Sequence, residues 1–228
     1  MAERSLREER RAERAARRDE RSGAGPARDG HDPGRLPGAT AKFALFGEVL
    51  FTGILVTGLS LPVVSIPLAF AVGTRHLRRF VRGESSSMEL VWRDLAPRNL
   101  LRSLPVGLGF TLLVAVLAVD LMLGYDGVVP GAGLALAVGW VGLAVVATTL
   151  LTASRLWEPE RGWLAALRGC WPEWRSDPVA VLYLLAGVVF VGAVSWQLLP
   201  LVVPGIGCLI LAILAIPQRP RRTAAPVE

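Results

Sequence analysis

Two carboxylates lie within apolar stretches of the sequence, where an ionised side chain is costly and is therefore a functional candidate by default. Glu48 is the only ionisable residue between positions 43 and 74. Asp120 lies near the end of a later apolar run. Each also has a simpler interpretation: Glu48 can extend to a polar boundary or pair with Lys42 or an arginine, and Asp120 can be solvated beside Asp126. The sequence leaves both interpretations open.

The other residues of catalytic or metal-binding type do not form a set. His31 and His76 are the 2 histidines of the chain, and neither has a second metal ligand at helical spacing. Cys170 and Cys208 form no C-x-x-C pattern and are interpreted as packing residues. No Ser/His/Asp set and no glycine-rich phosphate loop followed by lysine occurs in the sequence. We therefore predict that the protein is not an enzyme and uses no metal or cofactor.

The chain that carries these candidate residues consists of apolar segments that alternate with charged segments. Hydrophobic residues make up 52% of the 228-residue chain and charged residues only 19%, and nearly all charges fall in residues 1–42, 75–102, 155–177 and 219–228. The segments between them are long enough for the roughly 20 residues with which a helix crosses a layer of ~30 Å. A soluble chain would scatter charge along each helix. The pattern predicts an all-α, polytopic transmembrane bundle.

The first apolar segment, residues 43–74, is too long for one crossing, because a helix of that length extends about 48 Å. Pro62 and Pro67 interrupt it near the middle. We therefore predict a hairpin whose second helix begins near Val64 and continues to about Val81.

The remaining apolar segments predict two further hairpins. Residues 100–124 and 131–154 form one pair of crossings, separated by a tight external turn. Residues 179–216 exceed one crossing, and Pro200 and Pro204 divide them into a last pair. The prediction is six crossings in three hairpins.

The distribution of basic residues predicts the orientation. All 25 lysine and arginine residues lie before position 43, in 75–102, in 155–175 or after 217, and the three predicted external turns contain none. The positive-inside rule then predicts that both termini are cytoplasmic. The predicted organisation is an arm at 1–40, a transmembrane domain at 41–218 and a tail at 219–228.

The arm at residues 1–40 contains almost no large apolar side chains and is predicted to be disordered. Its arginines alternate with acidic residues, and no aromatic residue is present for stacking on bases. We therefore predict a solvated tail or weak attraction to anionic lipid rather than nucleic-acid binding.

Two short helices are predicted in the cytoplasmic segments. The first covers about residues 87–96, is opened by a capping box in which Glu89 is the acidic residue, and carries Trp92. Pro97 is predicted to end it. Its tryptophan and flanking arginines are typical of a helix in the headgroup layer.

The second short helix covers about residues 160–171, and its apolar face is formed by Trp163, Leu167 and Trp171. We predict that both short helices lie parallel to the membrane and that these three side chains point to lipid or to the bundle. Side chains projecting into the cytoplasm would instead favour a protein partner.

Part of the sequence resembles a known family. Residues 59–67 (LSLPVVSIP), the basic helix end at 75–79 (RHLRR) with its Gly83-Glu84 turn, and residues 91–100 (VWRDLAPRNL) resemble the YesL-like family of bacterial membrane proteins. The resemblance covers about residues 55–102, while the long arm and Pro97 depart from the family pattern. It implies a bacterial cell membrane location. Family members have no known biochemical activity and often accompany genes for carbohydrate uptake and polysaccharide breakdown.

Two functional classes follow. The first is an accessory or interaction protein beside a carbohydrate uptake system, whose partners are the bilayer, anionic lipid headgroups, and another membrane protein or a second copy of the chain. The alternative is a small-solute transporter or channel, supported by the proline-broken hairpins and Glu48. Few polar residues are available to line a path through the predicted crossings, which favours the first class.

Overall fold

The computed structural model describes residues 37–84, 87–127 and 131–216. These residues form helices and contain no strand, which confirms the all-α prediction. Three of the helices are long and apolar enough to cross a membrane, namely α5 (Pro97–Tyr125), α6 (Ala132–Leu156) and α8 (Pro178–Gln197). Two shorter apolar helical segments are Phe43–Leu59 and Leu199–Ala215. By length and composition the described helices are those of a membrane protein.

The chain divides into two units, Met1–Lys42 and Phe43–Glu228. Most of the predicted arm at 1–40 and the whole predicted tail at 219–228 lie outside the described residues. Helix α2 (Pro37–Leu59) begins within the predicted bounds of the arm. Disorder of the arm stays a prediction.

The break predicted between the first two helices is confirmed. Helix α3 (Ile66–Val81) follows α2 after a 3-10 turn at Val63–Ser65. Pro62 precedes this turn in an extended conformation, and the Ser65 hydroxyl lies 2.6 Å from the Pro62 carbonyl oxygen. Pro67 lies in the first turn of α3, where its missing N–H would have had no helical partner. The prolines therefore separate the helices without leaving helical hydrogen bonds unmade.

Helix α3 is buried on two faces. Ala69 and Phe70 belong to a core cluster shared with α2 and with α9 (Val202–Ala215). Leu68 and Val72 belong to a second cluster, which includes Trp157. The helix also packs against α5 and α6. Burial on two faces makes α3 the centre of the described bundle.

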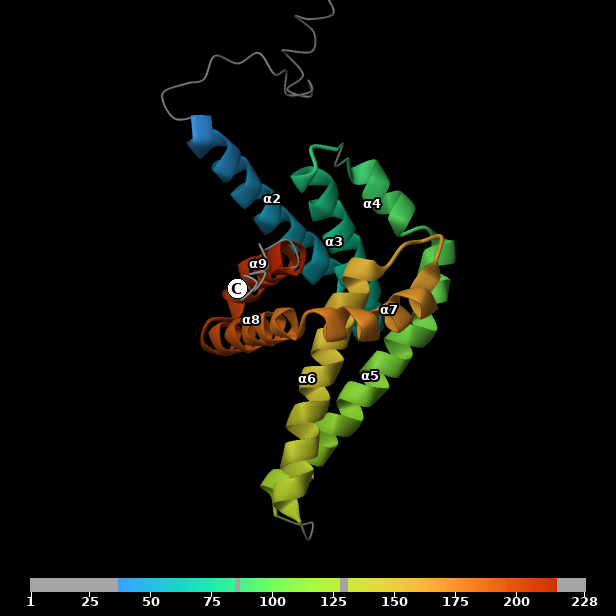
Figure 1. Cartoon of the computed structure of the whole chain (residues 1–228), viewed down its shortest axis with the longest axis vertical. Coiled ribbons are helices and arrows are strands. Elements are labelled where there is room, and N and C mark those ends of the chain that lie inside the picture. The colour runs from blue at the N-terminus through green and yellow to red at the C-terminus, as the bar shows by residue number, and fades with distance from the viewer. Residues whose placement is uncertain (1–36, 85–86, 128–130, 217–228) are drawn as a thin grey trace, which may run out of the picture. The chain divides into compact units, whose positions relative to one another are not determined.

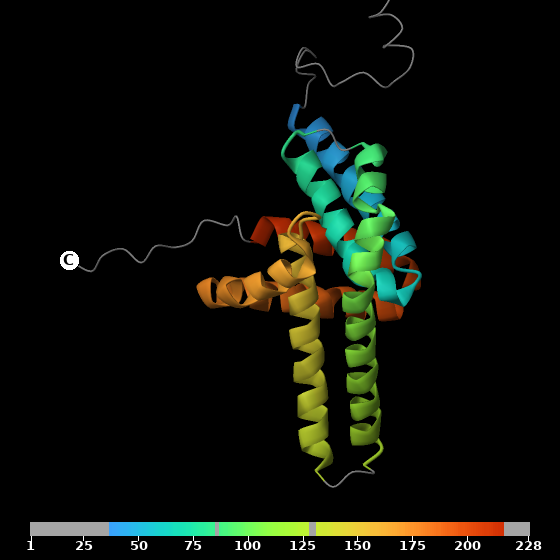
Figure 2. The ribbon, with the colours of Figure 1, turned by 90° about the vertical axis from the view of Figure 1, so that its right-hand side faces the viewer.

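Helices α5 and α6 run side by side and extend away from the other helices (Figures 1 and 2). A Cβ atom on Gly139 of α6 would lie 2.6 Å from the Leu121 side chain of α5, so the two helices approach closely. Their outward apolar side chains, such as Leu112, are exposed. Each large apolar side chain left in water forgoes about 1.5–3 kcal/mol. These faces therefore require an apolar surrounding.

The short helices differ in detail from their predicted bounds. Helix α4 (Met88–Asp94) begins after Ser87, whose side chain makes no capping hydrogen bond. The capping box predicted at residues 86–89 begins at Ser86, which lies outside the described residues. Helix α7 (Gly162–Ser176) continues through Pro172 past its predicted end at residue 171. The last turn of α7 is anchored to α6, because the Trp174 indole N–H lies 3.2 Å from the Thr152 hydroxyl.

A break also separates α8 from α9, as predicted, and it consists of the 3-10 turn Leu199–Leu201. Pro204 is not part of the break but lies in the first turn of α9, which tolerates proline. Both views show α8 and α9 running across the α5–α6 pair rather than along it (Figures 1 and 2). This arrangement does not confirm three parallel hairpins.

The contact between α5 and the turn at Val63–Ser65 generates a prediction about two glycines of α5. A Cβ atom on Gly107 would lie 1.8 Å from the Val64 carbonyl oxygen, whereas one on Gly109 would meet nothing within 4 Å. We expect Gly107→Ala to lower stability by about 1–3 kcal/mol through overpacking. Gly109→Ala should leave stability unchanged or raise it by up to about 1 kcal/mol, since alanine favours the helix.

The thermal midpoint of unfolding is measured for each purified variant in detergent, with tryptophan fluorescence as the signal. Equal midpoints for Gly107→Ala and Gly109→Ala would contradict the packing of α5 against this turn.

Candidate functional site

Of the two intramembrane carboxylates predicted from sequence, Glu48 lies in a polar contact between helices. Its Oε1 atom on α2 is 2.6 Å from Nε2 of His76 on α3, and His76 is 1% exposed. The two atoms are at ion-pair distance but are not aligned as a hydrogen bond, and Nδ1 has no partner among the described residues. The Phe51 ring covers the imidazole at 5.6 Å between centroids. Glu48 therefore faces another helix.

Sequence reasoning treated His76 as isolated and missed this pair. A signal was present, because Glu48 and His76 lie about equally far before and after Pro62. A helix reversal at that proline brings such positions to the same level.

Asp120 lies partly buried between α5 and α6. Its Oδ2 atom is buried and has no hydrogen-bond partner among the described residues. This atom faces α6, since a Cβ atom on Gly139 would lie 3.4 Å from it. No polar group from another described helix joins Asp120 there, so it does not form a site with Glu48.

The most extensive polar cluster is built around Asp94, which is 3% exposed. Its Oδ2 atom accepts from Nε of Arg75 at 3.2 Å and from Nη2 of Arg79 at 2.9 Å. The Arg75 guanidinium also lies 5.7 Å from the centroid of the Trp157 ring. One carboxylate thus fixes two arginines of α3, and a buried charge is paired as its burial requires.

The corner between α4 and α5 is fixed by hydrogen bonds to neighbouring side chains. The Asn99 amide donates to the Asp94 carbonyl oxygen at 3.1 Å. The Ser103 hydroxyl donates to the Asn99 carbonyl at 2.8 Å and accepts from the Trp163 indole N–H at 2.7 Å. The first turns of α5 are therefore held to α4 and to α7.

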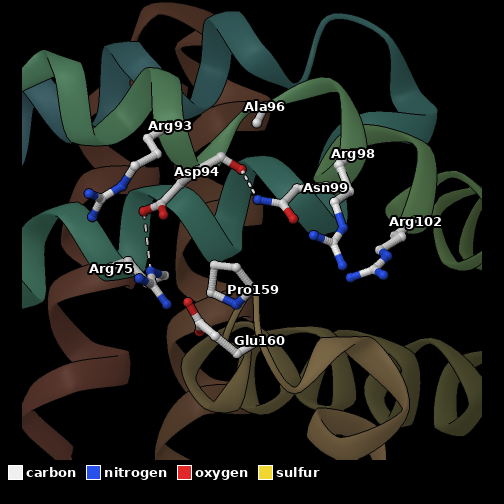
Figure 3. A pocket seen from close by; sticks show the side chains of 9 residues that line it. All are labelled: Arg75, Arg93, Asp94, Ala96, Arg98, Asn99, Arg102, Pro159 and Glu160. Carbon is white, nitrogen blue, oxygen red and sulfur yellow. Dashed lines mark hydrogen bonds and ion pairs between the residues drawn. The ribbon is translucent and has the colours of Figure 1, made fainter.

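A cleft of about 500 Å³ opens beside this corner. Figure 3 shows its lining and the bonds from Asp94 to Arg75 and Asn99. Four arginines and two carboxylates line the cleft, together with Ala96, Asn99 and Pro159: Arg75, Arg93, Arg98, Arg102, Asp94 and Glu160. The cleft is therefore electropositive.

A second polar cleft, of about 250 Å³, involves arginines at the junction of α3 and α6. Arg78 donates to the Arg155 carbonyl oxygen. Arg155 itself pairs with Glu173 at 2.6 Å. Arginines of both predicted cytoplasmic segments are thus brought together by the fold.

The predicted apolar stripe of α7 is divided. Trp163 is buried at 5% exposure and points into the bundle, as predicted. Leu167 is 37% exposed and Trp171 64%, and Trp92 of α4 is 66% exposed. Trp157, which sequence reasoning did not single out, is 2% exposed and packs with its ring centroid 5.9 Å from that of Trp163. The tryptophans therefore form a buried pair and a separate exposed set.

The cysteines also differ from each other. Cys170 is buried, and burial raises the pKa of its thiol to about 11. It is a packing residue, as predicted, and its thiolate is scarce at neutral pH. Cys208 is exposed, so the packing interpretation is wrong for that residue. Among the described residues, no group of three or more His, Cys, Asp or Glu side chains is placed to hold a metal ion.

No protein-family model matches the chain, and no curated protein or solved structure is detectably similar to it. The resemblance to the YesL-like family accordingly enters below as part of a proposal.

The Asp94 cluster generates a prediction about charge removal. Asp94→Asn leaves Arg75 and Arg79 without their carboxylate, and breaking a buried pair from one side costs about 3–5 kcal/mol. The matched control is Glu84→Gln, because Glu84 lies 3.9 Å from Arg82 and both side chains are more than half exposed. An exposed pair of this kind is worth at most about 1 kcal/mol.

We expect a large fall in thermal midpoint for Asp94→Asn and almost none for Glu84→Gln, measured in the same detergent. If the two variants unfolded at the same temperature, the Asp94 cluster would not be a structural centre.

Proposed function

We propose that the chain is an integral protein of the bacterial cytoplasmic membrane that crosses it six times in three hairpins, with both termini in the cytoplasm. The observation that carries the membrane location is the exposure of α5, α6 and α8. Only 17%, 17% and 6% of their most apolar windows are buried, although each has a mean hydropathy above 2. Helices of this composition are stable when lipid covers them.

The orientation is supported by where the arginines lie. The arginine-lined clefts adjoin the start of α5 and the end of α6, whereas the end of α5 and the start of α6 lie at the opposite end of this helix pair (Figure 1). Positive charge on one side of a membrane hairpin is typical of its cytoplasmic side. If α8 and α9 also cross the membrane, as we propose, this pair must lie along α5 and α6 in the bilayer rather than across them.

Labelling of single cysteines tests this topology in a background with Cys170→Ala and Cys208→Ala. A membrane-impermeant maleimide applied to intact cells should label Asp126→Cys and Leu199→Cys, because both positions belong to external turns of the proposal. Arg161→Cys should react only after permeabilisation. Labelling of Asp126→Cys but not Leu199→Cys in intact cells would refute the third hairpin.

We further propose that the protein acts as an accessory or interaction protein beside a carbohydrate uptake system. The exposed tryptophans support this role, since Trp92 of α4 and Trp171 of α7 are exposed and belong to neither core cluster. The Trp171 ring is within 5.6 Å of the Arg175 guanidinium carbon, so the exposed face combines aromatic surface with positive charge. Aromatic residues and arginine are the side chains that most often dominate protein interfaces. The resemblance to the YesL-like family supports the association with carbohydrate uptake.

A transporter of small solutes is the second candidate, and the contact between Glu48 and His76 favours it. The hydroxyls of Thr52 and Thr74, on the same two helices, are buried without hydrogen-bond partners among the described residues. A carboxylate, an imidazole and free hydroxyls are groups that a proton or cation path uses.

Copurification from mild detergent distinguishes the two candidates. We expect the double variant Trp92→Ala/Trp171→Ala to lose proteins that copurify with the wild type, with little change in its thermal midpoint, because both side chains are exposed. Glu48→Gln should retain those proteins. Transport predicts the reverse pattern, in which Glu48→Gln abolishes solute uptake and the tryptophan variant does not affect it.

A further inference from the structure

We propose that the cleft at the corner of α4 and α5 is a binding site for a phosphoryl anion, held mainly by Arg98 and Arg102. The proposed ligand is not a protein partner, and the site does not depend on the accessory role. Three features support the site: the charges in the cleft, the position of two arginines on α5, and the hydrogen bonds that fix neighbouring side chains.

The charges of the cleft do not cancel. Asp94 is shared between Arg75 and Arg79 of α3, so its charge is already neutralised by residues on one wall. Arg93, Arg98 and Arg102 have no carboxylate within 4.0 Å among the described residues, and Glu160 is the other carboxylate of the lining. An anion entering the cleft would therefore meet a net positive field.

The position of the arginines on α5 is unfavourable without an anion. Arg98 and Arg102 are four residues apart, so their like charges face each other on one side of the helix. They also lie in the first two turns of α5, whose first turn contains no acidic residue. A helix N-terminus carries partial positive charge and favours anions over cations. A bound anion would remove both repulsions.

The geometry suits a phosphoryl group. Arg98 and Arg102 both line the cleft, and in Figure 3 their guanidinium groups extend to the same side of α5, toward the cleft that Pro159 and Glu160 also line. A guanidinium donates two parallel N–H groups to phosphate oxygens, and two such groups can bind one phosphoryl anion. The cleft volume of about 500 Å³ accommodates a phosphate with an attached organic group.

The surroundings are ordered in advance of binding. Arg75 is fixed by Asp94 and by the Trp157 ring, and Asn99 is bonded to the Asp94 carbonyl. Ser103, one residue beyond Arg102, connects α5 to Trp163. The part of the lining formed by Arg75 and Asn99 therefore loses little conformational entropy when a ligand binds.

The phosphoryl group has two possible sources, a soluble phosphorylated molecule and the headgroup of an anionic lipid. The test uses the full-length protein in nanodiscs. In phosphatidylcholine nanodiscs, inorganic phosphate is titrated and followed by calorimetry. In nanodiscs that also contain phosphatidylglycerol, lipid retained by the purified protein is measured by native mass spectrometry.

We compare the wild type with Arg98→Gln/Arg102→Gln and with Arg168→Gln, which removes an exposed arginine of α7 outside the cleft. The double variant should weaken binding of phosphate, or retention of phosphatidylglycerol, by about tenfold or more, because charge-assisted contacts are lost. Arg168→Gln should bind as the wild type does. An effect in the phosphate titration assigns a soluble source, and an effect confined to phosphatidylglycerol assigns a lipid headgroup.

A second variant keeps the proposal testable if the double variant is poorly folded. Glu160→Gln removes a negative charge from the lining and should strengthen phosphate binding or lipid retention. Absence of binding of both probes to the wild type would overturn the proposal. So would a double variant that is folded and binds like the wild type, or a Glu160→Gln variant that binds more weakly.

Discussion

Burial of α3 on two faces is the constraint on which the other polar arrangements depend. The helix is apolar from Pro67 to Val72 but ends in a strongly basic sequence, and its core contacts on both sides hold that basic end inside the bundle. Charged and polar groups held there need partners, because an unpaired buried charge is very costly. Asp94 from α4 pairs with the arginines, and Glu48 from α2 lies against His76. Packing of one helix thus explains both polar clusters.

The sequence predicted the features that depend on local chemistry. Proline cannot donate a backbone hydrogen bond, so the breaks after α2 and after α8 could be placed within a few residues. Apolar length likewise identified α5, α6 and α8. The same rule was too strict for Pro172 and Pro204, which lie inside helices. Proline costs little in a first turn, and tertiary contacts hold the turn that follows Pro172.

Features that depend on contacts between distant segments could not be obtained in this way. Helical spacing placed Trp163 and Trp171 on one face, but whether each is buried depends on which helices pack over α7. The partners of Asp94 lie 15 and 19 residues away, on a helix whose rotation is set by its core contacts. The direction of α8 and α9 relative to α5 is equally a property of packing. Hydropathy contains no information about such rotations and directions.

The length of α5 affects where its first turns lie relative to the hydrocarbon layer of a bilayer. A helix of 29 residues extends about 43 Å, which exceeds a hydrocarbon layer of ~30 Å by more than two turns. Strong tilting could absorb such an excess, but the basic first turns favour placing it at the cytoplasmic end. Arg98 and Arg102 would then stand at the level of lipid phosphates while the rest of the helix stays in hydrocarbon. The excess length of α5 over the hydrocarbon layer would therefore determine how far the arginine cleft lies from the acyl chains.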